Sequence, residues 1–67
     1  MNRLKAIRLA QGKHQVEIAD MANIARRSYI RYEADATPPN VLSAIRIADA
    51  LGVADLREIW NPAASPK

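Results

Sequence analysis

The stretch that decides the fold runs from Gln15 to Glu33 and reads QVEIADMANIARRSYIRYE. Its apolar residues recur every three or four positions, which is typical of amphipathic helices. Asn23 interrupts the pattern, and asparagine tolerates the left-handed backbone that a tight turn needs. The stretch therefore predicts one helix over about Gln15 to Met21 and another over about Arg26 to Ala34. We expect Ile24 to fill the core between them.

The second of these helices is basic, because it carries Arg26, Arg27 and Arg31. Tyr29 and Tyr32 are three positions apart and face another way, so we expect them in the core rather than stacked on a ligand. Two short helices joined by a tight turn, with a basic second helix, suit insertion into the major groove of DNA. The alternative is an ordinary solvated basic face, as on most arginine-rich helices.

One helix precedes this pair and another follows it. Asn2 can cap the first, which runs to about Gln11, and Gly12 ends it. After two prolines, Asn40 can cap the other, which Gly52 ends. The positions of that helix that we expect to face the core are Val41, Ala44, Ile45, Ala48 and Leu51.

A last turn, capped by Asp55, carries Leu56, Ile59 and Trp60 until Pro62 stops it. These three apolar residues either close the core or form a patch for dimerisation. No segment alternates at period two, and thirteen of the 67 residues are alanine, the best helix former. We therefore expect an all-α fold, a compact bundle of about five short helices, in one domain over residues 1–61 with a flexible tail over 62–67.

Composition narrows the function further. A chain of 67 residues has room for one small domain, and it has no cysteine for a disulfide or a thiolate metal site. It has one histidine, no glycine-rich phosphate loop and no group of carboxylates in a plausible cleft, so we expect no enzyme, no cofactor and no metal. The net charge is +3, and residues 1–33 carry seven basic and three acidic side chains, which favours a polyanionic partner.

The apolar runs are too short to span a bilayer, and the first ten residues are too charged for a secretory signal. We therefore expect a cytoplasmic protein of bacterial or phage type that associates with the nucleoid.

Three motifs resemble the phage-repressor or Cro-type helix-turn-helix family, also called the XRE or lambda-repressor-like family. Gln15-x-x-Ile18-Ala19 is similar to its Q-x-x-L-A, and Arg26-x-Ser28-Tyr29-x-Arg31-Tyr32-Glu33 to its R-x-T-I-x-R-I-E. Pro39 is followed at a similar distance by Ala48-x-Ala50-Leu51-Gly52-Val53. The chain departs from the family pattern at Asn23, Ala25, Lys13 and the loop Ala34-Asp35-Ala36-Thr37, which stands where the family often has a basic, glycine-containing loop.

The resemblance implies which residues contact double-stranded DNA. The expected base contacts lie on the second helix of the pair and are Arg26, Arg27, Ser28, Ile30 and Arg31. The expected phosphate contacts are Gln15, His14, Lys13 and Arg8. The resemblance also implies a salt bridge between Arg8 and Glu33 that ties the first helix to the third.

The function that the resemblance implies is a sequence-specific transcription regulator, most simply a repressor that binds a roughly palindromic operator as a homodimer. The alternative is a protein-interaction module, such as an antitoxin-like or co-regulator chain that acts mainly through a small protein partner. Co-purification with a second small protein, and DNA binding that vanishes at moderate salt, would favour that alternative.

Overall fold

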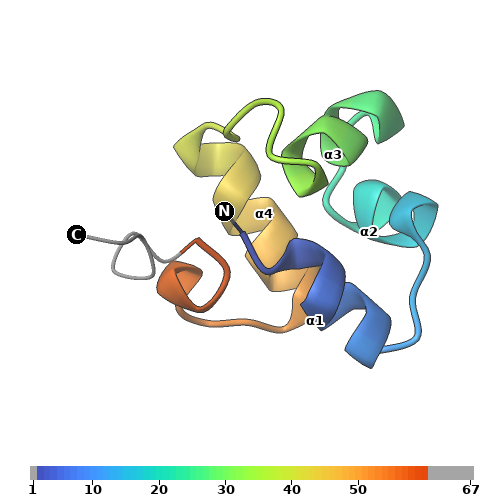
Figure 1. Ribbon diagram of the computed structural model, residues 1–67, viewed down its shortest axis with the longest axis vertical. Helices are drawn as coiled ribbons and strands as arrows, with labels where there is room; N and C mark the ends of the chain where they lie inside the picture. Colours follow the sequence, from blue (N-terminus) through green and yellow to red (C-terminus); the bar gives the residue numbers. More distant parts are fainter. Residues whose placement is uncertain (1, 61–67) are drawn as a thin grey trace.

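The computed structural model of the protein describes residues 2–60 and is all-α (Figure 1). The four α-helices and one 3₁₀ helix of this range are α1 (Leu4–Ala10), α2 (Gln15–Met21), α3 (Arg26–Glu33), α4 (Val41–Leu51) and η1 (Leu56–Glu58). Within the described residues, no helix is long and apolar enough to cross a membrane. The expected bundle is confirmed, with a 3₁₀ turn as its fifth element. Pro62 and the expected tail lie outside the described residues, as does the domain boundary at 61.

The predicted turn signals account for where the helices begin and end. Asn23, between α2 and α3, has φ 56°, and Gly52, after α4, has φ 72°. The Asn40 side chain accepts a 2.8 Å hydrogen bond from the Ser43 N–H and caps α4. Ala25, which cannot cap, precedes α3 with no side-chain bond to its first turn. The α3 helix thus starts with its N–H groups less well satisfied than those of α4.

Helix α4 runs through the middle of the bundle and contacts both α2 and η1, while α2 also contacts α3 (Figure 1). The fully buried side chains at the centre of the core come from four elements and the segment after η1: Leu4, Ile18, Tyr29, Ile47 and Ile59. The two ends of the described range meet, because the Arg3 N–H donates to the Ile59 carbonyl at 3.0 Å. This scaffold places α3 on the outside of the bundle, backed by α2.

The predicted core face of α4 is wrong in part. Val41 is 74% exposed and Ile45 is 42% exposed, whereas Ile47, which was not predicted, is completely buried. Residues 44, 47, 48 and 51 form the inward stripe at helical spacing. Val41 and Ile45 lie about a quarter-turn or more from the centre of that stripe, so they face outward.

Candidate nucleic-acid interface

The outward face of α3 is formed by Arg27, Ile30 and Arg31. These positions are three and four apart, so their side chains lie along one stripe of the helix. Tyr29, on the opposite side, is fully buried and anchors the helix to the core, while Ile30 is 39% exposed. The α3 helix therefore presents two guanidinium groups and one apolar side chain to solvent.

The other two expected base contacts flank this stripe. Arg26 is exposed at the first position of α3, and Ser28 is half-buried beside the core. Among residues 2–60, the side chains of Arg26 and Arg27 make no hydrogen bond or ion pair, which leaves their donors available. Arg31 uses one donor within the protein, because its Nη2 bonds to Thr37 Oγ1 at 2.9 Å.

Lys13, His14 and Gln15 lie together where α2 begins. His14 precedes the helix with extended backbone, and the Glu17 carboxylate accepts a 2.8 Å hydrogen bond from its N–H. Lys13 and Gln15 are half-buried, and His14 is exposed. The expected phosphate contacts on α2 are therefore adjacent, and the start of the helix is held in place by its own cap.

The guanidinium group of Arg8 is buried and forms hydrogen bonds within the protein. Its Nε and Nη2 donate to the two oxygens of Glu33, both at 2.9 Å, and its Nη1 donates to the Lys13 carbonyl at 2.9 Å. The side chains of Arg8 and Glu33 are only 9% and 5% exposed. The ion pair that ties α1 to α3 is thus present. The same burial argues against the expected phosphate contact, because every nitrogen of the Arg8 guanidinium already donates within the fold.

Glu33 accepts two further hydrogen bonds, from the Tyr29 hydroxyl at 2.9 Å and from Gln15 Nε2 at 3.0 Å. Burial by itself raises the pKa of Glu33, but the hydrogen bonds from Arg8, Tyr29 and Gln15 outweigh it and hold the pKa below its ordinary value. Burial, together with the bond to the Glu33 carboxylate, raises the pKa of the Tyr29 phenol. Glu33 is therefore ionised and Tyr29 neutral at neutral pH.

The loop after α3 is held by Asn2, which the sequence indicated only as a helix cap. Asn2 Nδ2 donates to Asp35 Oδ1 and to the Tyr32 carbonyl, both at 2.7 Å, while its Oδ1 accepts from the Leu4 N–H at 3.0 Å. Asp35 has φ 61°, so this clamp holds a left-handed residue in the loop. Nothing in the sequence spacing signals a contact between residues 33 positions apart.

The expected dimerisation patch is only partly on the surface. Ile59 is completely buried, so it belongs to the core and is withdrawn from the patch. Leu56 and Trp60 are half-buried and pack against that core. The exposed large apolar side chains of α4 are instead Val41, Leu42 and Ile45.

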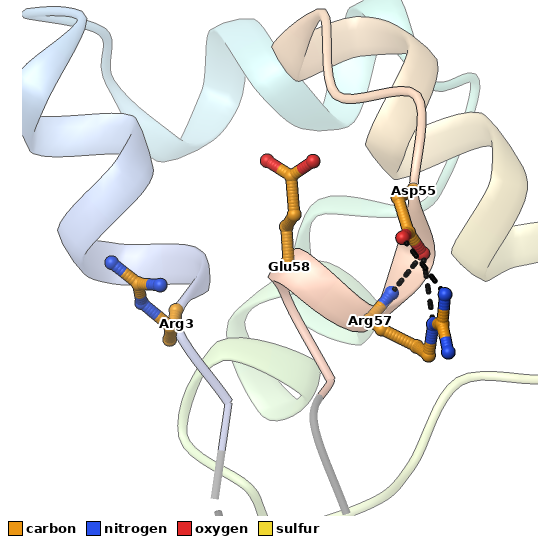
Figure 2. Close-up of a pocket in the computed structure, with 4 residues that line it drawn as sticks. All are labelled: Arg3, Asp55, Arg57 and Glu58. Atoms are coloured by element: carbon orange, nitrogen blue, oxygen red, sulfur yellow. Dashed lines mark hydrogen bonds and ion pairs between the residues drawn. The ribbon is translucent and has the colours of Figure 1, made fainter.

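A surface cavity of about 370 Å³ lies near η1, lined by Arg3, Asp55, Arg57 and Glu58 (Figure 2). Figure 2 shows the Arg57 guanidinium turned toward Asp55, with which it forms a 3.4 Å ion pair. The lining thus contains two cations and two anions, and it favours neither an anionic nor a cationic ligand. Its charges do not match those of a nucleic-acid site.

Comparison with known proteins agrees with this geometry. The sequence model of the family described as Helix-turn-helix matches residues 4–59, from the first residue of α1 to the buried Ile59. No curated protein matches the chain significantly. The match covers all four α-helices, including the α2–turn–α3 unit with its exposed arginines. The chain therefore belongs to the helix-turn-helix family of the Cro/C1 (XRE) type, a family of DNA-binding transcription regulators.

Proposed function

We propose that the protein is a repressor that inserts α3 into the major groove of a specific operator. The observation that carries this proposal is the outward stripe of α3, on which Arg27 and Arg31 flank Ile30. An arginine fork donates to O6 and N7 of a guanine, and an apolar side chain fits the methyl group of a thymine. The stripe has the donors and the apolar contact that reading a mixed sequence requires.

Contacts to the DNA backbone come from the start of α2. The Lys13 ammonium adds charge, and the side chains of His14 and Gln15 add hydrogen-bond donors or acceptors beside it. Such contacts set the register of α3 on the duplex and make affinity fall with salt, because they release counterions.

The proposed binding unit on DNA is a homodimer. An eight-residue helix is about 12 Å long, so α3 covers only about three or four base pairs. A two-fold dimer doubles the contacts and reads half-sites about 34 Å apart, which makes the operator roughly palindromic. Leu56 and Trp60 remain candidates for the dimer contact.

The test is selection of bound duplexes from a random pool, with the wild type, Arg31→Ala and the control Arg57→Ala in parallel. Arg57 lies in η1, on the other side of the bundle from α3 (Figure 1). We expect a palindromic consensus with half-sites about ten base pairs apart, relaxed at one position in each half-site by Arg31→Ala only. A wild type without a consensus would refute the operator-binding proposal.

A second candidate is a protein-interaction module, favoured by the exposed apolar side chains of Val41, Leu42 and Ile45 on α4. Transcription assays on a reporter with the selected sequence separate the two functions. Repression by the purified protein alone supports the first proposal, and repression only with an added protein partner supports the second.

A further inference from the structure

Glu33 joins three helices through one carboxylate. It accepts two hydrogen bonds from Arg8 on α1, one from Tyr29 on its own helix and one from Gln15 on α2. A carboxylate has about four lone-pair positions, so all of its acceptor capacity is used. The bonds from Arg8 and Tyr29 suffice to tie α1 to α3 and to neutralise the buried charge. The hydrogen bond from Gln15 is not needed for either of these structural tasks.

That bond fixes which end of the Gln15 amide faces the protein. An ionised carboxylate only accepts hydrogen bonds, so the NH₂ group of Gln15 has to face Glu33. The flipped amide would bring its carbonyl oxygen against Glu33 Oε1, two acceptors with no proton between them. Gln15 is therefore held in one orientation by the charge state of Glu33.

The fixed orientation suits a phosphate. The NH₂ group has two N–H bonds, and Glu33 takes one, at 3.0 Å. The second N–H remains for an outside acceptor, and phosphate oxygens only accept. Gln15 and Glu33 also line a surface cleft of about 230 Å³, together with Lys5, Ile30 and Ala34. Lys5 is exposed and, among residues 2–60, its ammonium has no partner, so the open side of the cleft is cationic.

We propose that Glu33 is a positioning residue for DNA binding, which holds Gln15 with an N–H group directed at one phosphate of the operator. The inference rests on the proposed function, since it needs Gln15 to contact DNA. Glu33 itself does not touch the nucleic acid, and it acts through the hydrogen bond to Gln15 Nε2. The ion pair that stabilises the fold then also sets the geometry of a backbone contact.

The test is a double-mutant cycle on affinity for the selected operator, with Gln15→Ala, Glu33→Gln and the double variant. Circular dichroism fixes a temperature at which all the proteins are folded. We expect each single substitution to weaken binding about tenfold, the loss of one hydrogen bond to a charged oxygen. The double variant should bind no more weakly than Gln15→Ala. Losses that multiply in the double variant would show a purely structural Glu33 and overturn the inference.

Arg8→Lys is the matched control, because it removes the two parallel hydrogen bonds of the guanidinium but keeps a positive charge beside Glu33, so the ionised carboxylate and its bond to Gln15 stay in place. Its effect on the affinity of the folded protein should be small, and it should multiply with that of Gln15→Ala. A tenfold loss with Arg8→Lys that disappears in the Gln15→Ala background would also overturn the inference.

A second measurement uses the wild type alone and so does not depend on a variant that folds. Nuclear magnetic resonance of the Gln15 side-chain amide should show one N–H shifted by the carboxylate, and the shift should follow the ionisation of Glu33. Adding operator should move the other N–H. An amide that rotates freely at neutral pH would refute the positioning role.

Failure of the inference and failure of the proposed function give different results. If the wild type binds an operator and Gln15→Ala binds equally well, the positioning role fails and the operator-binding function stands. If the wild type selects no operator, both fail.

Discussion

Arg8 and Glu33 are joined by two parallel hydrogen bonds of 2.9 Å, from Nε to Oε2 and from Nη2 to Oε1, in an almost fully buried site. The other ion pair of the described residues, Arg57 with Asp55, is long at 3.4 Å and largely exposed. A buried pair leaves an uncompensated charge when one partner is removed, whereas water screens an exposed pair. The two pairs therefore differ in what they contribute to the fold.

Glu33→Ala should destabilise the protein by about 3–5 kcal/mol, since Arg8 is left buried without its carboxylate. A domain of this size has a free energy of unfolding of only about 3–10 kcal/mol, so the variant should be close to unfolding at 25 °C. Urea denaturation followed by circular dichroism measures the loss. Arg57→Ala is the control and should leave the midpoint unchanged. An unchanged midpoint for Glu33→Ala would mean that the pair contributes nothing to stability.

The lowered pKa of Glu33 gives a pH dependence with a definite sign. The unfolded chain binds the Glu33 proton near the ordinary glutamate pKa of 4.5, and the folded protein binds it only at lower pH. The stabilisation is therefore complete above that ordinary pKa and is lost as the pH falls through the lower pKa of the folded protein. Denaturation at a series of pH values should show this loss in the wild type, and Glu33→Gln should lack it. Equal acid sensitivity of the two proteins would contradict the assignment.

The features of the fold that can be predicted from the sequence are those determined by neighbouring residues, such as the bounds of a helix. The bounds of α2 match the prediction because the apolar spacing and the left-handed Asn23 are both local signals. The prediction of which face of α4 is buried was partly wrong. Apolar residues occupy more than half of the circumference of this helix, so their spacing alone does not identify the inward side. Packing against the other helices decides it, and it buries Ile47 and leaves Val41 exposed.

Side-chain partners in the site depend on contacts that are distant in sequence. The charge and position of Arg8 suit either an ion pair or a phosphate contact, and only burial separates the two. The bond from Gln15 to Glu33 joins residues 18 positions apart, and no motif spacing indicates it. The exposed arginines of α3, by contrast, follow from helical periodicity once the buried Tyr29 fixes which side faces the core.

Ala25→Ser should stabilise the protein by about 1 kcal/mol. Ala25 precedes α3 with φ −58° and ψ 136°, and a serine there can accept a hydrogen bond from the Ser28 N–H, which no side chain caps now. Thermal unfolding should show a midpoint higher by about 4–8 °C. The reverse control is Asn40→Ala, which removes the cap of α4 and should cost about 0.5–2 kcal/mol. A lower midpoint for Ala25→Ser would show that the start of α3 has no room for the hydroxyl.

Lys13→Ala should weaken binding to all DNA sequences alike and lower the salt dependence. If the Lys13 ammonium neutralises one phosphate, the slope of log K against log salt should fall by about 1 per protomer. Lys13 bonds to Arg8 only through its backbone, with its carbonyl accepting from Arg8 Nη1 and its N–H donating to the Arg8 carbonyl, so the substitution keeps both contacts. Fluorescence anisotropy at several salt concentrations measures the slope, with Arg57→Ala as the control. An unchanged slope would remove Lys13 from the interface.

Arg27→Lys separates the charge of α3 from its hydrogen-bonding geometry. Arg27 lies on the outward stripe, and its side chain has no partner among residues 2–60, so its planar fork is available to a guanine. Lysine keeps the positive charge but cannot donate two parallel hydrogen bonds from one planar group. We expect affinity for random DNA to stay unchanged, while discrimination at one operator base pair falls by about 1–3 kcal/mol. Competition binding with single-base operator variants measures that discrimination. If Arg27→Lys keeps full discrimination, Arg27 contacts phosphate rather than a base, and Arg31 becomes the principal base-reading arginine of the stripe.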